Sequence, residues 1–337
     1  MEKESSMGFF EKYLTLWVLI CMILGIVLSQ FFPSISQGLN EWKVGEVSIP
    51  IGICLFLMMY PALLNFQMKE VKKLTKAPKP ILITLFSNWI IAPIVTVILA
   101  HYFLEGHDQL IVALILLGAS PCTAMVIVWG DLVKGNQEQN VITTSLNTIT
   151  IMFLYAPVVV LLTGIQGITI DRWGLFISVL VFIGIPLVAG LISKKAITKR
   201  RGKEWFENTY RPAVGKVSIV ALLTTLIVLF ALNGDVLLKN PKEMGLVSIP
   251  LLLGFFIIVG LNIMITKLLK LKYKEAVISV IIGSSSHFEI AIATAIGLYG
   301  LNSQAALGTT MGLFWEVPIM LGLVYLGKYL GRKGFWS

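Results

Sequence analysis

Charge is scarce in this sequence. Only 13% of its 337 residues are charged, whereas 56% are hydrophobic, which is far more than the core of a water-soluble protein needs. Ten membrane crossings of about 20 residues each would use roughly 200 residues and leave little chain for a separate soluble domain. The composition therefore excludes a soluble globular protein and predicts a polytopic membrane protein whose function lies among its helices.

Cysteine is scarce as well. The three cysteines, Cys21, Cys54 and Cys122, lie inside apolar segments, where a disulfide framework has no compartment in which to form. We therefore expect reduced thiols. No cleavage-site pattern follows the first apolar segment, so we expect that segment to be a retained membrane span rather than a signal peptide.

Basic residues outnumber acidic ones, 27 to 18, and the formal net charge is +9. The lysines and arginines gather in the loops at 69–79, 194–211 and 267–274, between apolar segments. This distribution is the one that sets the orientation of a membrane protein, so it argues against a nucleic-acid partner. It predicts that these three loops and both termini are cytoplasmic.

Ten apolar segments are long enough to cross the bilayer. They lie at about 12–32, 47–65, 80–104, 110–134, 138–163, 173–193, 213–232, 245–266, 275–299 and 304–327. The predicted fold is therefore an all-α integral membrane protein with ten transmembrane helices, placed in the cell membrane.

The two halves of the chain resemble each other. Gly118 and Ser120 recur 165 positions later as Gly283 and Ser285, and several other residues keep a spacing of 165 or 170. Because each half contains five spans, the second half enters the membrane from the opposite side. The pattern predicts two inverted five-helix repeats, residues 1–165 and 166–337, an architecture typical of alternating-access transporters.

The fourth span is interrupted by Gly118-Ala119-Ser120-Pro121-Cys122-Thr123. Glycine and proline at the centre of an apolar stretch predict a helix that unwinds halfway across the membrane, with Cys122 at the start of the second half-helix. Backbone of this kind is tolerated at that depth only where it lines a cavity or is buried in protein. A helix start also favours the thiolate, which selects a soft metal or metalloid. We therefore expect Cys122 to face a binding site.

The ninth span carries a second interruption, from Gly283 to Glu289. Glu289 and Glu316 are the only carboxylates well inside the predicted spans, and such costly groups usually mark an ion or proton pathway. Glu316 precedes a Val-Pro pair, so a structural role at a helix kink is the alternative there. His287 has the position that Cys122 has in the first half; it is either a ligand or proton-relay partner of Glu289, or a histidine satisfied by a nearby carbonyl.

Amides in the third and fifth spans, Asn88 and Asn147, lie beside the interrupted spans. They are either ligands or helix-to-helix hydrogen bonds.

Several motifs resemble those of the arsenite permeases in the bile-acid, arsenite and riboflavin transporter superfamily. They are Met58-Met59-Tyr60-Pro61, Asn88-Trp89-Ile90-Ile91, Ser120-Pro121-Cys122-Thr123-Ala124-Met125-Val126, Phe288-Glu289 and Glu316-Val317-Pro318. The resemblance covers nearly the whole chain. It implies a transport domain of spans 3–5 and 8–10 around two crossed broken helices, and a panel domain of spans 1, 2, 6 and 7. The chain departs from the family pattern at Ser286-His287, where the family tends to have asparagine before Phe-Glu.

The resemblance also implies export of trivalent arsenic, and in some members antimony, coupled to the proton gradient. It assigns metalloid binding to the thiolate of Cys122 and proton coupling to Glu289, with Glu316 at a further common acidic position. The full set of expected site residues is Cys122, Asn147, Asn88, Ser120 and Thr123 for the substrate, and Glu289, Glu316 and His287 for protons. No cofactor is expected.

Two alternatives remain at this point. Sodium-coupled uptake of an organic anion fits the fold equally well, but such a substrate has no need of Cys122. An intramembrane enzyme with Cys122 as nucleophile and His287 as base is the other, and no residue that would orient the base is visible.

Overall fold

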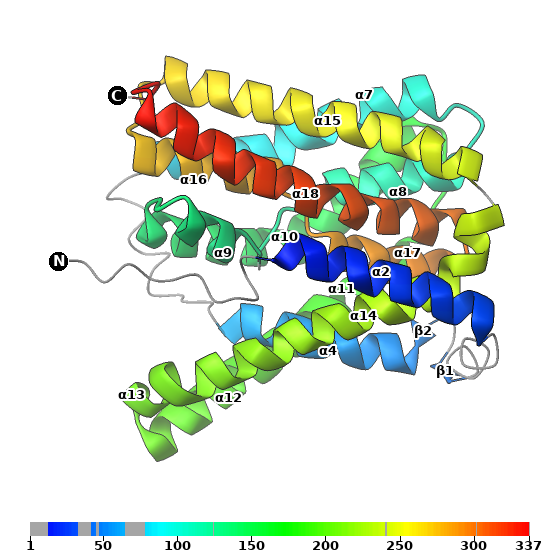
Figure 1. The fold of residues 1–337 in the computed structure, drawn as a ribbon, viewed down its shortest axis with the longest axis horizontal. Coiled ribbons are helices and arrows are strands. Elements are labelled where there is room, and N and C mark those ends of the chain that lie inside the picture. The colour runs from blue at the N-terminus through cyan, green and yellow to red at the C-terminus, as the bar shows by residue number, and fades with distance from the viewer. Residues whose placement is uncertain are drawn as a thin grey trace.

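The computed structural model describes residues 13–32, 42–44, 47–64, 78–123, 125–239, 241–300 and 302–336. The amino-terminal residues 1–12 and most of the basic loop predicted at 69–79 lie outside these ranges. The described chain is almost entirely helical (Figure 1). Its exception to the all-α prediction is one antiparallel pair of two-residue strands, β1 (Lys43–Val44) and β2 (Val47–Ser48).

Helices occupy all ten predicted ranges. In chain order they are α2 (Leu14–Phe31); α4 (Ile49–Leu64); α6 (Pro78–Phe86), η2 (Ser87–Ile91) and α7 (Ala92–Phe103); α8 (Asp108–Gly118) and α9 (Met125–Leu132); α10 (Gln137–Ile165); α11 (Arg172–Val179), η3 (Leu180–Gly184) and α12 (Ile185–Arg201); α13 (Lys203–Trp205), η4 (Phe206–Tyr210) and α14 (Arg211–Lys239); α15 (Pro241–Leu268); α16 (Tyr273–Ser284) and α17 (Phe288–Tyr299); and α18 (Gln304–Arg332). Six continuous helices in the described part are long and apolar enough to cross a membrane, and α8 and α17 are shorter apolar helices. The chain is a multi-pass membrane protein.

Three of the long helices contain a single π-helical turn, and each turn precedes a proline by the same distance. The pairs are η2 with Pro93, η3 with Pro186 and η4 with Pro212. Proline lacks an N–H group and its ring presses on the carbonyl four residues earlier, so a locally wider turn lets the helix continue past it. The first of these turns matters for the site, because it carries Ser87 and Asn88.

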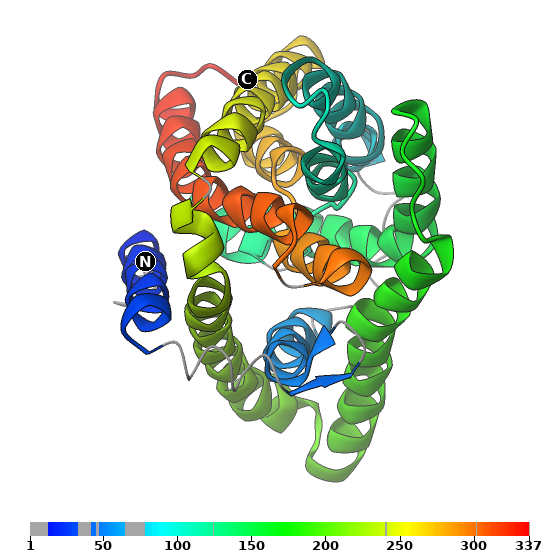
Figure 2. The same cartoon turned by 90° about the vertical axis from the view of Figure 1, so that its right-hand side faces the viewer.

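The helices form two groups. In one, α14 packs against α2 and α4, and α12 packs against α4; in the other, α7, α8, α15, α16, α17 and α18 pack against one another. Figures 1 and 2 show both groups, with α12 and α14 extending away from the second group. Helices α8, α16 and α17 consist largely of buried residues. The interrupted spans are therefore enclosed by protein, as irregular backbone inside a membrane requires.

Candidate functional site

The segments predicted as the fourth and ninth spans are broken, as the sequence predicts. Helix α8 ends at Gly118 and α9 begins at Met125, while α16 ends at Ser284 and α17 begins at Phe288. Cys122 lies in the extended stretch before α9, so the prediction that it starts the half-helix was wrong by three residues. Its N–H group bonds across to the other broken span, and this keeps the residue out of the helical turn.

The two extended stretches cross, and they pair there like antiparallel strands. Pro121 lies opposite Ser286. The N–H of Cys122 donates to the carbonyl of Ser285 at 3.3 Å, and the N–H of His287 donates to the carbonyl of Ser120 at 2.6 Å. Polar backbone groups that each break leaves without a helical partner are thus satisfied by the opposite break. We call this the crossing, residues 120–122 with 285–287.

One amide holds the backbone of the cysteine, and a second amide holds the first. Asn147, which is fully buried, donates from Nδ2 to the carbonyl of Cys122 at 3.1 Å. Asn88 donates from its own Nδ2 to Oδ1 of Asn147 at 3.2 Å. Of the two roles that the sequence left open for these amides, the structure displays the helix-to-helix hydrogen bond. This series of two hydrogen bonds, from Asn88 to Asn147 and from Asn147 to Cys122, links η2 and α10 to the first break.

A third amide, which sequence reasoning missed, holds the second break. Asn262 on α15 is fully buried and donates to the carbonyl of Gly283 and to Oγ of Ser284, both at 3.1 Å. Ser87 donates to the same Gly283 carbonyl at 2.9 Å. A Cβ at Gly283 would lie 3.1 Å from both supporting side chains, which explains the glycine. The available signal was a single amide within the eighth predicted span.

The two membrane-embedded carboxylates meet the second break from different helices. Glu316, on α18, accepts hydrogen bonds from the Ser285 hydroxyl at 2.7 Å, from the Ser286 N–H at 3.0 Å and from the Ser286 hydroxyl. Glu289, on the first turn of α17, has its Oε2 atom 2.7 Å from Nδ1 of His287. All three ionisable side chains are at most 3% exposed. The carboxylates and the histidine therefore form two separate hydrogen-bonded groups, Glu316 with Ser285 and Ser286, and Glu289 with His287.

The thiol of Cys122 is enclosed. The residue is 1% exposed and packs within the apolar core, and Thr123 beside it is 5% exposed. None of the three cysteines forms a disulfide, as expected. A solute can therefore reach this thiol only when the surrounding helices move.

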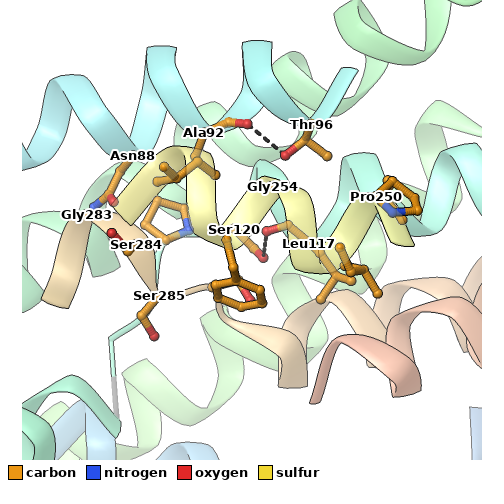
Figure 3. Close-up of a pocket in the computed structure, with 17 residues that line it drawn as sticks. Asn88, Ala92, Thr96, Leu117, Ser120, Pro250, Gly254, Gly283, Ser284 and Ser285 are labelled. Carbon is orange, nitrogen blue, oxygen red and sulfur yellow. Dashed lines mark hydrogen bonds between the residues drawn. The ribbon is translucent and has the colours of Figure 1, made fainter. Parts of the chain in front are cut away.

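A pocket adjoins the crossing (Figure 3). Its floor consists of Ser120, Pro121 and Ser284 to Ser286, and Asn88 lies beside that floor. Its apolar walls come from α8 and α15, through Leu114, Leu117, Leu251, Phe255 and Ile258, and α7 adds Ala92 and Thr96. The cavity has a volume of about 60 Å³, and one water molecule needs only about 10–15 Å³ on the same measure, so the pocket can hold a small solute. Of the predicted substrate residues, Ser120 and Asn88 line the pocket, whereas Cys122, Thr123 and Asn147 do not.

The family is decided by comparison with known proteins. The sequence profile of the sodium bile acid symporter family matches residues 52–240, more than half of the chain. The chain belongs to the sodium bile acid symporter family. Two proteins described as arsenical-resistance protein Acr3 are similar to it: that of Alkaliphilus metalliredigens is 40% identical over 100% of this chain and 96% of its own, and that of Corynebacterium glutamicum is 31% identical over 99% and 92%. An uncharacterized transporter of Synechocystis, slr0944, is 40% identical over 98% and 91%. The resemblance to arsenite permeases is thereby confirmed.

In this sodium bile acid symporter family protein, Glu316→Gln should lower stability and cause a mild defect in transport. An uncharged amide accepts hydrogen bonds more weakly and brings an N–H₂ group toward two serine hydroxyls that now donate to the carboxylate. Mismatching one buried polar group costs about 1–3 kcal/mol. Thermal unfolding of the purified protein, read together with its transport rate, measures both effects. Unchanged stability would contradict the structural role of these hydrogen bonds.

Proposed function

We propose that this protein exports arsenite, and antimonite as its chemical neighbour, out of the cell in exchange for protons. The observation that carries the proposal is the position of Cys122 in the crossing of two broken helices, with buried carboxylates attached to the opposite break. Broken helices that meet within a bundle are typical of transporters that alternate access around a central site. The relatives described as arsenical-resistance proteins support the choice of substrate.

The chemistry of binding follows from one thiol and several hydrogen-bonding groups. As(OH)₃ forms an As–S bond when the Cys122 thiol replaces one hydroxyl group, which leaves as water with the thiol proton. Hydrolysis reverses the step. Three thiolates would hold As(III) too tightly for turnover, whereas one soft contact releases its ligand. We propose that Ser120, Thr123 and Asn147 hydrogen-bond the remaining hydroxyls.

Proton coupling is proposed for Glu289 together with His287. The Glu289 carboxylate lies 2.7 Å from an imidazole nitrogen of His287, and a proton can be shared between the two groups. An unpaired charge is costly in these buried surroundings, so a proton should enter or leave the pair only when a change of access lets water reach it. Glu316 bonds to the same break from α18. Because it accepts three hydrogen bonds there, we propose that it mainly stabilises the backbone of the break.

The proposed architecture has ten spans in two inverted repeats, residues 1–165 and 166–337. Two observations support it. Cys122 and His287 are equivalent positions at the spacing of 165 residues, and so are Ser120 and Ser285. The hydrogen bond from Cys122 to Ser285 and the one from His287 to Ser120 are therefore the same contact, made once by each half of the chain. The packing of α14 against α2 and α4, and of α12 against α4, supports a panel domain of spans 1, 2, 6 and 7. The packing among α7, α8 and α15 to α18, together with that of α9 and α10, supports the transport domain, and α11 of span 6 contacts it through α10 and α17. We propose the cell membrane as its location.

Transport into inverted membrane vesicles tests the function. With an imposed pH gradient, acidic inside, vesicles containing the protein should accumulate arsenite whether or not sodium is present. Vesicles prepared without it provide the control. A requirement for sodium together with uptake of an organic anion such as taurocholate would instead support the symporter alternative.

Orientation is tested by labelling single cysteines in a variant that lacks the three native ones. Asp108 is the first residue of α8 and Lys203 follows α12, and both are exposed. If the termini and the basic loops are cytoplasmic, a membrane-impermeant maleimide added to intact cells should label Asp108→Cys and not Lys203→Cys. Labelling of both from outside would contradict the inverted topology.

A further inference from the structure

We propose that the pocket beside the crossing accepts the organic group of monosubstituted trivalent arsenicals, R–As(OH)₂, where R is a small alkyl or aryl group. The inference rests on the proposed function and extends its substrate range from the inorganic to the organic form of As(III). It is carried by the way polar and apolar groups are divided within the pocket.

The polar groups gather at or beside the crossing, apart from Thr96 on α7, whose hydroxyl donates to the carbonyl of Ala92 at 2.7 Å. Ser120 and Ser284 to Ser286 belong to the pocket floor, and Asn88 lies next to it. Helices α8 and α16 both end at this floor, so their carbonyl ends, which carry partial negative charge, point toward it. This arrangement suits a neutral solute that donates hydrogen bonds, such as the hydroxyl groups of an arsenous acid.

The floor keeps hydrogen-bonding capacity for such a solute. The Ser120 hydroxyl donates to the carbonyl of Leu117 at 2.9 Å, and its oxygen can still accept. The Ser284 hydroxyl accepts from Asn262 at 3.1 Å and can still donate. One R–As(OH)₂ molecule offers two hydroxyl groups, each able to donate and accept. Its arsenic would then lie next to Pro121, one residue from the thiol of Cys122.

The apolar walls offer no favourable contact to inorganic arsenite. Leu114, Leu117, Leu251, Phe255 and Ile258 present side chains without polar atoms, and As(OH)₃ has no apolar surface to place against them. A carbon substituent on arsenic does have such a surface. Burying one group the size of a methylene strengthens binding by about fourfold. A phenyl group that fits should therefore bind at least about tenfold more tightly than the hydroxyl it replaces.

The experiment uses the full-length protein in proteoliposomes with three probes, arsenite, methylarsonous acid and phenylarsonous acid. Transport of each probe and its competition against radiolabelled arsenite are measured on a pH gradient. We expect both organic probes to be transported. We also expect half-maximal inhibition of arsenite transport at a concentration at least about tenfold lower for phenylarsonous acid than for unlabelled arsenite.

Two substitutions change the pocket in opposite directions. Leu251→Trp reduces its space, and Phe255→Ala enlarges it. The matched control is Leu253→Trp, the same change on the same helix at a position that is 39% exposed and absent from the pocket. Leu251→Trp should lower the ratio of phenylarsonous acid transport to arsenite transport by at least about fivefold, and Phe255→Ala should raise the preference for phenyl over methyl. Leu253→Trp should leave both ratios unchanged.

The outcomes separate this inference from the proposed function. If the wild-type protein transports no arsenite, the proposed function fails. If it transports arsenite but the organic probes neither compete nor cross, the pocket inference alone is overturned. Equal effects of Leu251→Trp and Leu253→Trp would also overturn it, and the Phe255→Ala ratio decides the question if Leu251→Trp does not fold.

Discussion

Replacing Cys122 with serine is expected to lower arsenite transport by on the order of a hundredfold, while the protein stays folded and inserted. Serine is nearly the same size as cysteine, so it fits the buried position, but its oxygen is a poor ligand for the soft As(III) centre. The backbone hydrogen bonds of this residue to Ser285 and Asn147 do not involve the side chain, so the crossing should persist. Arsenite uptake by inverted vesicles, normalised to the amount of inserted protein, measures the loss.

The two other cysteines provide matched controls. Cys21 is a buried member of the apolar core, and Cys54 lies partly buried on α4. Cys21→Ser and Cys54→Ser should therefore leave arsenite transport within about twofold of the wild-type rate, since neither residue belongs to the crossing. Normal transport by Cys122→Ser would show that no thiolate contact is required.

Replacing Glu289 with glutamine is expected to abolish pH-driven accumulation of arsenite while leaving its binding in place. Glutamine resembles a carboxyl group that is permanently protonated, so the site can still be occupied through Cys122 but can no longer release a proton. The partner of His287 also changes from an acceptor-only carboxylate to an amide, which keeps one acceptor oxygen for the 2.7 Å contact. Counterflow, in which labelled arsenite exchanges for unlabelled arsenite without a pH gradient, should therefore persist.

The two assays together separate coupling from ligation. A direct contact between Glu289 and the arsenite hydroxyls would make binding, exchange and accumulation fall in parallel. Glu316→Gln serves as the comparison, because it changes a carboxylate of equal burial whose hydrogen bonds go to the serines of the same break. Full pH-driven accumulation by Glu289→Gln would exclude both a coupling role and a ligand role.

Local patterns in the sequence were enough to locate the helices and the breaks. Apolar runs of spanning length define helices because a backbone in lipid must bond to itself, and glycine and proline interrupt those runs at Gly118, Pro121 and Gly283. The cost of a membrane-embedded charge likewise marked Glu289 and Glu316 without any structure. These properties depend only on neighbours along the chain.

The place of Cys122 relative to its half-helix needed the tertiary structure. Its N–H group could have opened α9, but it bonds instead to Ser285, a residue more than 160 positions away. The conformational preferences of the residues around Cys122 cannot predict that partner. The extended conformation at the crossing is therefore set by the pairing of the two breaks.

The supporting residues were decided by tertiary structure for the same reason. Ser87 reaches Gly283 across 196 positions, Asn262 holds the same carbonyl from α15, and Glu316 bonds the serines of the second break from α18. The pocket, too, exists only where α7, α8 and α15 come together at the crossing. The sequence by itself determined which spans break and which ionisable groups the membrane must tolerate. Helix packing alone decided which side chains satisfy the broken backbone, because those contacts join residues that lie far apart in the sequence.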